Sequence, residues 1–304
     1  MRHIFVINPK ADRVDRTPEI SAKLKDYDGK IDYEIYVTKS LGDAQGYVRD
    51  YLKSHDPKET YRFYACGGDG TLYDVVNGAY GFPNAEVACL ASGSGNDFVK
   101  NFHDLEAFRD LDRLIAGAAK KIDLLKVDDK VCINITNYGF DGEVTFAQLK
   151  YKRRPFMNGP RAYKAAALHC FLFKMNQPLK LTLDGKVIFD GKGLLVAIAN
   201  GFCYGGGYHC APNAKIDDGL IDVCLIKKVG KLKAAGFMKI FREGRHIESP
   251  KTKDLVIYER CKKAIIESTK PVAYAIDGEV FRQQKVEVSI LPLALSFVVP
   301  AHKN

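Results

Sequence analysis

Three absences narrow the class of this chain before any motif is considered. None of its eight cysteines forms a CxxC pair, and several lie in apolar runs such as 87–90, so we expect buried thiols in a reducing compartment. No apolar run approaches the ~20 residues that a helix needs to cross a bilayer. The N-terminus enters a strand-like run without a signal peptide. We therefore expect a cytoplasmic protein whose membrane contact, if it has any, is peripheral.

Composition indicates two folded domains and an anionic partner. The chain has 304 residues, 46% of them apolar, which is more than one average domain contains. Lys and Arg number 46 against 37 Asp and Glu, which gives a net charge of +9 at pH 7. Such an excess favours nucleic acid, phosphates or acidic lipid as the partner, and composition does not choose among them.

Strand-like runs alternate with helical patterns in the first part of the chain, which is the sign of a parallel sheet covered by helices. The expected strands are residues 3–8, 32–38, 61–66 and 87–90, and the expected helices are residues 44–52, 71–77 and 105–119. We expect residues 1–123, with 291–304 returning to them, to form an α/β domain.

After about residue 122 the pattern changes to short strands separated by turn signals, and Asp184-Gly185 is a strong hairpin signal. The expected strands are residues 131–136, 179–183, 187–189, 194–199, 220–226, 254–258, 264–268 and 285–290, with helices at 160–174 and 231–242. Residues 124–290 should form an antiparallel β-rich domain, arranged as a sandwich. The fold class expected for the whole chain is therefore α/β, with a parallel-sheet domain first and a β-rich domain second.

The strongest local signal is the run Cys66-Gly67-Gly68-Asp69-Gly70-Thr71, which follows an apolar strand and precedes a helix. Glycine lets backbone amides approach a ligand closely, and a helix N-terminus favours negative charge, so this turn suits phosphate. It matches neither the GxxxxGK[ST] loop nor the GxGxxG turn. A carboxylate beside a triphosphate is tolerated where Mg²⁺ lies between them or where the acid orients the nucleophile. The alternative is that Asp69 only caps the helix.

A second loop of the same kind follows the next strand, with the sequence Ser92-Gly93-Ser94-Gly95-Asn96-Asp97-Phe98. Neighbouring parallel strands direct their carboxyl ends to one edge of a sheet, where open α/β sheets bind ligands. We therefore expect the two loops to converge, and two such loops indicate a phosphate site more strongly than one.

These two loops resemble the diacylglycerol kinase catalytic-domain family, which includes bacterial lipid kinases, sphingosine kinases and ceramide kinases. Further matches follow in order along the whole chain: Asn8-Pro9, Thr38 with Gly42-Asp43-Ala44, Asp123-Leu124, Asn137-Tyr138-Gly139-Phe140-Asp141, Asp217-Asp218-Gly219-Leu220 and Asp277-Gly278-Glu279. The resemblance implies an N-terminal ATP-binding domain of the NAD kinase and diacylglycerol kinase type and a C-terminal lipid-substrate domain. It implies ATP-dependent transfer of the γ-phosphate to a lipid hydroxyl.

The resemblance also implies roles for particular residues. Asp277 would accept the proton of the lipid hydroxyl as general base, and Asp69, Asp97 and Asp123 would form an acidic network around the catalytic Mg²⁺. ATP would be bound by Asn8, Pro9, Lys10, Ala11, Asp12, Thr38, Gly67, Gly68, Asp69, Gly70, Thr71, Leu72, Tyr73, Ser94, Asn96 and Glu279. A structural Mg²⁺ would be held by the Asp218 side chain and by carbonyls near Lys215 and Leu220.

The chain departs from the family pattern in three segments expected to bind the nucleotide. Lys10-Ala11-Asp12 follows Asn8-Pro9 where the family usually has a small residue or glycine, and Tyr73-Asp74 stands where Asn-Glu is common. Ala91 replaces a usual proline. Ser94 replaces a usual threonine and preserves its hydroxyl.

Alternatives stay open at this point. A NAD kinase shares the GGDGT turn and similar chemistry, although the second glycine loop together with Asp277-Gly278-Glu279 favours a lipid kinase. A catalytically silent nucleotide- or lipid-binding protein would retain the fold, although Asp69, Asp97 and Asp277 are all present. Taken locally, Asp277-Gly278 also fits an ordinary hairpin turn. Nucleic-acid binding would explain the positive charge but not the acid clusters, so we do not expect it.

Cations and apolar side chains occur together in the second half of the chain. The segment Lys150-Tyr151-Lys152-Arg153-Arg154-Pro155-Phe156-Met157 precedes a largely apolar helix at 162–175, and residues 231–245 are a second basic candidate. Each cation near an anionic bilayer adds about 1 kcal/mol of attraction, so we expect the lipid substrate to be met at an anionic membrane surface. The alternative is a solvated loop before a core-facing helix. The sequence leaves open which lipid is used and whether unpaired sheet edges form a homodimer.

Overall fold

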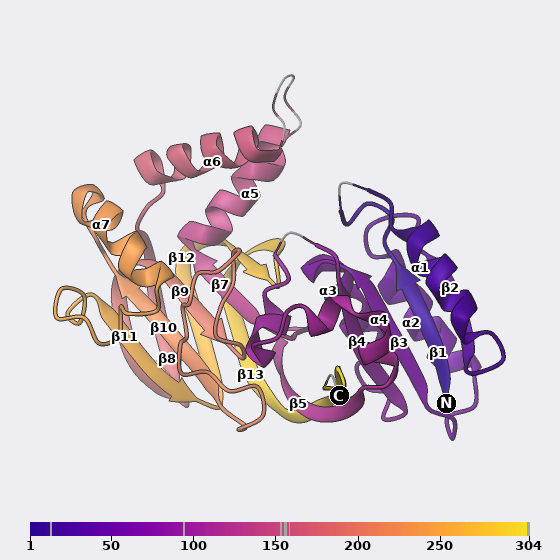
Figure 1. The fold of residues 1–304 in the computed structure, drawn as a ribbon. Helices are drawn as coiled ribbons and strands as arrows, with labels where there is room; N and C mark the ends of the chain where they lie inside the picture. Colours follow the sequence, from indigo (N-terminus) through magenta and orange to yellow (C-terminus); the bar gives the residue numbers. More distant parts are fainter. Residues whose placement is uncertain (13, 94, 153, 155–156, 158, 303–304) are drawn as a thin grey trace. The chain divides into compact units, whose positions relative to one another are not determined.

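The computed structural model describes all residues except 13, 94, 153, 155–156, 158 and 303–304. The chain forms two compact units (Figure 1). Unit 1 consists of Met1–Leu124 and Pro292–Asn304, and unit 2 consists of Leu125–Leu291. Within the described residues, no helix combines the length and the hydropathy needed to cross a membrane.

Unit 1 is built on a parallel sheet with the strand order β2–β1–β3–β4. The strands are β1 (Arg2–Ile7), β2 (Asp32–Val37), β3 (Tyr61–Gly67) and β4 (Ala85–Ala91), and the last residues of β13 (Glu279–Val299) pair with β4 in parallel. Every residue of β3 is buried, as expected of a central parallel strand with both faces covered.

Helices connect the strands of unit 1, which confirms the expected α/β alternation. They are α1 (Thr17–Leu24), α2 (Asp43–Ser54), α3 (Asp69–Ala79) and α4 (Leu111–Ile115), with 3-10 turns at Lys25–Tyr27, Phe98–Phe102 and Ala107–Arg109. Pro18 lies in the first turn of α1, where its missing N–H costs nothing. The sequence did not predict this helix.

The helix expected at 105–119 is wrong. Asp110 accepts hydrogen bonds from the backbone N–H groups of Asp112 and Arg113, so its side chain caps a new short helix, α4, in the middle of the segment. Gly117 then passes so close to the chain end that a Cβ atom on it would lie 2.5 Å from Val299 O. Residues from Ala118 onward belong to strand β5 (Ala118–Val127).

Unit 2 is β-rich and its strands pair in antiparallel fashion, with the order β11–β10–β9–β7–β12–β13 and with β8 joining β9 and β12. The strands that complete it are β6 (Lys130–Cys132), β7 (Ile135–Gly139), β8 (Gln177–Leu183), β9 (Lys186–Ala199), β10 (Ile221–Lys227), β11 (Val256–Cys261) and β12 (Lys263–Ile276). Its helices are α5 (Phe140–Lys152), α6 (Gly159–Phe173) and α7 (Lys231–Arg242).

Two expectations for unit 2 need correction. The strand expected at 131–136 is interrupted, because residues between β6 and β7 turn their backbone N–H groups toward Asp277. The alternative in which 150–157 is a solvated loop is wrong for its first residues, because 150–152 form the last turn of helix α5 and Lys150 Nζ lies 4.8 Å from the centre of the Phe146 ring. Arg153, Pro155 and Phe156 lie outside the described residues.

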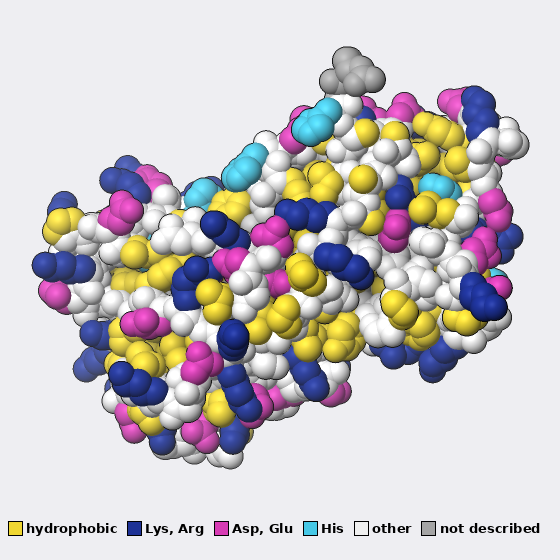
Figure 2. All heavy atoms as spheres, turned by 90° about the horizontal axis from the view of Figure 1, so that it is seen from below, with side chains coloured by type: hydrophobic (Ala, Val, Ile, Leu, Met, Phe, Trp, Pro, Cys, Tyr) yellow, Lys and Arg dark blue, Asp and Glu magenta, His cyan; other side chains and the backbone are white. Residues whose placement is uncertain are grey.

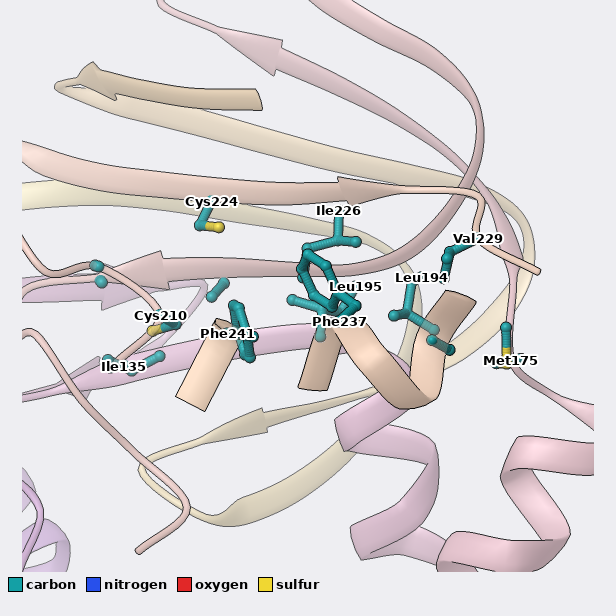
Figure 3. Close-up of a cluster of buried hydrophobic side chains, with 14 residues drawn as sticks. Ile135, Met175, Leu194, Leu195, Cys210, Cys224, Ile226, Val229, Phe237 and Phe241 are labelled. Atoms are coloured by element: carbon teal, nitrogen blue, oxygen red, sulfur yellow. The ribbon is translucent and has the colours of Figure 1, made fainter. Parts of the chain in front are cut away.

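Helix α7 packs its aromatic side chains onto the sheet of unit 2. Phe237 and Phe241 lie against Leu195 and Ile226, in a buried cluster that also contains Cys210 (Figure 3). The thiols of all eight cysteines are buried, as expected. The inward face of α7 is therefore committed to the core.

A buried carboxylate on α5 ties three elements of unit 2 together. Glu143 is 1% exposed and accepts hydrogen bonds from Lys174 Nζ, from Arg282 Nη2 at 2.8 Å and from the backbone N–H of Ala273 at 3.1 Å. Beside it, a Cβ atom on Gly142 would lie 2.4 Å from Ala273 O, so only glycine allows α5 to approach β12 this closely.

We predict that Glu143→Gln lowers the free energy of unfolding by ~3 kcal/mol, because it leaves two partly buried cations facing a neutral amide. Urea denaturation followed by tyrosine fluorescence measures this loss. The control Glu267→Gln removes a half-exposed carboxylate 4.0 Å from Lys285 and should cost less than ~0.5 kcal/mol. Equal losses in the two variants would contradict the role given to Glu143.

Candidate active site

Two glycine-rich loops lie in contact at the carboxyl ends of β3 and β4. The parallel register pairs Gly67 with Ala91, and Ser92 N donates to Gly67 O at 2.9 Å. A Cβ atom on Gly68 would lie 3.2 Å from the Cα atom of Gly93, and one on Gly93 would lie 2.5 Å from the Cα atom of Gly68. Only glycine permits this approach, so backbone from both loops meets at one edge of the sheet.

Asp69, the first residue of α3, joins the two loops through its carboxylate. Its Oδ1 accepts a hydrogen bond from Asp97 N at 2.7 Å, and a Cβ atom on Gly95 would lie 2.5 Å from its Oδ2. The cap position of α3 belongs to Gly68 and has no side-chain cap hydrogen bond, so the alternative in which Asp69 only caps the helix is wrong. Burial, and next the charge of Asp97, raise the pKa of Asp69 above its usual range.

A second carboxylate, Asp97, belongs to the neighbouring loop. It is buried, and its Oδ1 accepts a hydrogen bond from Lys100 Nζ at 2.5 Å. Asn96 has a left-handed backbone with φ +48° and donates from Nδ2 to Gly93 O at 2.6 Å, which closes the loop on itself. Ser94, expected to contact ATP, lies outside the described residues.

The Asn8-Pro9 turn lies against the first glycine loop. Asn8 N donates to Cys66 O at 3.0 Å, and Asn8 Nδ2 donates to Thr71 Oγ1 at 3.1 Å. The turn is tightened by hydrogen bonds from Lys10 N to Asn8 Oδ1 at 3.0 Å and from Ala11 N to Asn8 O at 3.2 Å. The structure thus brings the Asn8-Pro9 turn, whose residues were expected to bind ATP, into contact with the first glycine loop.

The other residues of unit 1 that were expected to bind ATP or Mg²⁺ differ in how far their side chains are buried. Thr38 N donates to Ile7 O at 2.9 Å, which places Thr38 at the carboxyl ends of β1 and β2. Leu72 and Tyr73 are 2% and 6% exposed on α3, so their side chains belong to the core and only their backbone is available to a ligand. Asp123 is fully buried on β5 and accepts a hydrogen bond from Leu293 N at 2.7 Å.

In unit 2, the Asp277 carboxylate lies in a cradle of hydrogen-bond donors. Its Oδ1 accepts from Asn134 N at 3.0 Å, Ile135 N at 3.1 Å and Cys132 Sγ at 3.2 Å, and its Oδ2 accepts from Ile133 N at 2.8 Å. Asp277 and Gly278 form a two-residue turn between β12 and β13, with φ values of +47° and +96°. The hairpin alternative is therefore correct for the backbone, but a turn does not require four donors on its carboxylate.

Two asparagines hold the cradle in place. Asn200 N donates to Asn134 O at 2.8 Å, Asn200 Nδ2 donates to Ile133 O at 2.8 Å, and Asn134 Nδ2 donates to Cys203 O at 2.9 Å. The two bonds from Asn200 satisfy the carbonyl groups of Ile133 and Asn134, which lose strand pairing where β6 and β7 are interrupted. The backbone N–H groups of the interruption are thereby left to the Asp277 carboxylate.

Burial and the cradle of donors shift the pKa of Asp277 in opposite directions. Burial raises the pKa of Asp277 to about 6, and the hydrogen bonds from the thiol and the three backbone amides oppose that rise. A carboxylic acid with this pKa is mostly ionised at neutral pH and is a stronger base than an exposed aspartate. Glu279, at the start of β13, is exposed.

The segment expected to hold a structural Mg²⁺ offers hard oxygen donors. Asp218 Oδ1 accepts a hydrogen bond from Leu220 N at 3.1 Å, and Asp218 Oδ2 is paired with Arg260. A carboxylate with the carbonyl groups of Lys215 and Leu220 fits the oxygen ligands that Mg²⁺ prefers, although the ion would share this carboxylate with a guanidinium group. Among the described residues, no group of three or more His, Cys, Asp or Glu side chains has the geometry of a metal site.

Sequence reasoning missed part of both clusters. Lys100 was not singled out, although its position three residues after Asp97 in a helical turn would have placed the two side chains together. Cys132, Ile133 and Asn134 were assigned to a strand. Backbone N–H donors leave no signature in residue types, so nothing in the sequence could have identified the cradle.

Comparison with protein families divides the chain into two matched regions. Residues 2–127 match the diacylglycerol kinase catalytic domain, and residues 134–299 match the YegS C-terminal NAD kinase beta sandwich-like domain. The first region holds the glycine loops, and the second holds Asp277 and the Asp217–Leu220 segment.

Curated relatives and solved structures agree with these matches. The chain is 29% identical over 267 residues to a diacylglycerol kinase of Staphylococcus carnosus, covering 86% of this chain and 82% of that protein. It is also 29% identical over 254 residues to one of Staphylococcus aureus, covering 82% and 77%. A crystal structure from Bacillus anthracis, described as a putative diacylglycerol kinase, has the same fold, with a TM-score of 0.75 and 22% identity over 98% of this chain and 96% of that one. The chain therefore belongs to the diacylglycerol kinase catalytic-domain family, a family of kinases.

Proposed function

We propose that this protein is an ATP-dependent lipid kinase that transfers the γ-phosphate to a hydroxyl of diacylglycerol or a similar lipid. The single observation that carries the proposal is the Asp277 cradle, because it holds one carboxylate ionised and fixed in direction. Relatives of 29% identity that are named diacylglycerol kinase support the choice of lipid as substrate class.

Asp277 has the properties of a general base for an alcohol. Three donors converge on Oδ1, whereas among the described residues Oδ2 accepts one hydrogen bond, from Ile133 N. Oδ2 therefore keeps a lone pair with which to accept the hydroxyl proton as the oxygen attacks phosphorus. The fixed amide donors would hold the carboxylate in one rotamer, so little reorganisation would precede the transfer.

The glycine loops of unit 1 are suited to the phosphates of ATP. Backbone N–H groups at the start of α3 and the positive end of its dipole would bind phosphate oxygens, and the closeness of Gly68 to Gly93 keeps side chains out of the way. Asp69 and Asp97 would be ligands for Mg²⁺, which when bound neutralises phosphate charge. Lys215, Asp218 and Leu220 would hold the second, structural ion.

The alternatives are a NAD kinase and a catalytically silent binding protein. Incubation with labelled ATP, Mg²⁺ and either a total lipid extract or NAD should give labelled lipid and no labelled NADP. Transfer to NAD alone would overturn the lipid assignment, and absence of transfer to either acceptor would favour a silent protein. The chromatographic position of the labelled lipid would identify the acceptor.

We predict that Asp277→Asn lowers kcat by at least ~10²-fold while ATP binding changes by less than about twofold, because the amide keeps the turn but cannot accept the proton. Calorimetry with ATP and initial-rate kinetics measure the two effects separately. Asp184→Asn is the matched control, since Asp184-Gly185 is another left-handed hairpin turn whose aspartate is exposed. Unchanged turnover in Asp277→Asn would remove the general-base assignment.

The pKa of Asp277 predicts an acidic limb in the pH profile of kcat/KM. Because the base must be ionised, activity should fall as the pH drops through about 6. Cys132→Ala removes a donor that favours the ionised form, so the pKa should rise and the limb should move to higher pH by about half a unit. Cys132→Ser restores a donor and should return the limb toward its original position. A lower rate with an unmoved limb would mean that Cys132 serves packing alone.

We also propose that the enzyme works on the cytoplasmic side of a membrane as a peripheral protein. Its lipid substrate has to be reached in a bilayer, and no described helix could span one. The excess of Lys and Arg over Asp and Glu fits an anionic surface.

A further inference from the structure

Helix α6 exposes a face of cations and large apolar side chains. Arg161, Lys164, Leu168 and Leu172 follow one another at helical spacing and are all exposed, and Leu168 is 60% exposed. Phe173, at the end of the helix, is 75% exposed. We call these five residues the α6 face. Burial of apolar side chains stabilises a folded chain, so exposed large residues gathered on one helix indicate a surface that becomes covered.

The opposite side of α6 already supplies the contacts that hold the helix in place. Ala162, Ala166 and Cys170 are buried. Ala166 and Cys170 pack with Val144 and Ala147 of α5 in one hydrophobic cluster. The α6 face is therefore not needed for folding.

Helix α7 extends this surface. Asn176, three residues beyond α6, exchanges two hydrogen bonds of 3.1 Å with the backbone of Val229, just before α7 begins. This pair brings the end of α6 next to the start of α7, where Leu232 is 95% exposed between Lys231 and Lys233. Figure 1 shows α6 and α7 on the same side of unit 2.

The charge of this region has one sign. Residues 144–183 contain eight Lys and Arg and no Asp or Glu, and α7 carries Lys and Arg without an acidic residue. On the face drawn in Figure 2, by contrast, acidic and basic side chains are mixed. Cations surrounding an apolar strip are complementary to a surface that is anionic outside and apolar beneath.

We propose that the α6 face, together with Leu232 and its two flanking lysines on α7, is the surface by which this protein docks on an anionic bilayer. Leu168, Leu172, Phe173 and Leu232 enter the headgroup boundary, while Arg161, Lys164, Lys231 and Lys233 contact acidic headgroups. The inference rests on the proposed function for its choice of a lipid bilayer as partner.

A second copy of the chain fits this surface less well than a bilayer does. A symmetric contact through the α6 face would bring its cations against those of the partner copy, since the same patch occurs on both sides. Like charges without an acidic counterpart oppose such a contact. An anionic lipid surface has no such conflict.

Co-sedimentation with vesicles tests the surface directly. The full chain should bind vesicles of mixed phosphatidylcholine and phosphatidylglycerol more tightly than vesicles of phosphatidylcholine alone. Leu168→Gln with Leu172→Gln should weaken binding to the mixed vesicles by about tenfold or more. The matched control, Leu41→Gln with Val187→Gln, replaces two apolar residues outside the surface that are more exposed than the test pair, and it should leave binding within about twofold. Arg161→Gln with Lys164→Gln should weaken binding mainly at low salt.

Three outcomes would overturn the proposal. The first is unchanged vesicle binding by the Leu168 and Leu172 variant. The second is equal binding of the native chain to both kinds of vesicle. The third is a dimer of the native chain, seen by light scattering, that the variant loses while its vesicle binding stays intact. A second measurement, the turnover of a short-chain diacylglycerol dissolved as monomers, separates docking from catalysis. The Leu168 and Leu172 variant should turn over this soluble substrate at the native rate, because no bilayer has to be bound. If the native chain phosphorylates no lipid, the proposed function fails while the vesicle measurement still decides whether this surface docks.

Discussion

The hydrogen bonds from three consecutive backbone amides to the Asp277 carboxylate are the constraint on which the candidate site of unit 2 depends. Amides that point at one carboxylate cannot also pair in a strand, so β6 and β7 are interrupted between Cys132 and Ile135. Asn200 satisfies the carbonyl groups of Ile133 and Asn134 that the interruption leaves without strand partners. Burying a carboxylate is costly without donors, and here the backbone supplies them.

In unit 1, close packing of the backbone positions the carboxylates of the candidate site, as hydrogen bonding positions Asp277 in unit 2. The contact between Gly68 and Gly93 brings two loops within reach of the Asp69 carboxylate, which then bonds to the N–H of Asp97. This arrangement puts two carboxylates close together, with Lys100 paired to one of them. The charge of Asp97 is among the causes that raise the pKa of Asp69, and a divalent cation would relieve that repulsion.

Much of the fold could be predicted from the sequence because its signals are local. Strands β1, β3 and β4 of unit 1 each contain an apolar run, and the glycine loops can be identified by residue type. Helix α5 was missed because its buried face contains Gly142 and Glu143, which do not form an apolar stripe. Strand β9 was expected as two pieces, since its first half is largely exposed and its second half is buried. The end of β6 could not be predicted from the sequence. Residues after Cys132 are of types typical of a strand, but their hydrogen bonds to Asp277 interrupt the strand.

The left-handed backbone conformation of Asp277 restricts which residue types can occupy this position. Asparagine and aspartate tolerate a φ of +47° better than other residues with a side chain, because their short polar groups bond locally. Glutamate would carry the same charge, but it would add a methylene and the strain of this conformation. The backbone conformation alone therefore favours aspartate over glutamate as the acidic residue of this turn, independently of the reaction that the residue serves.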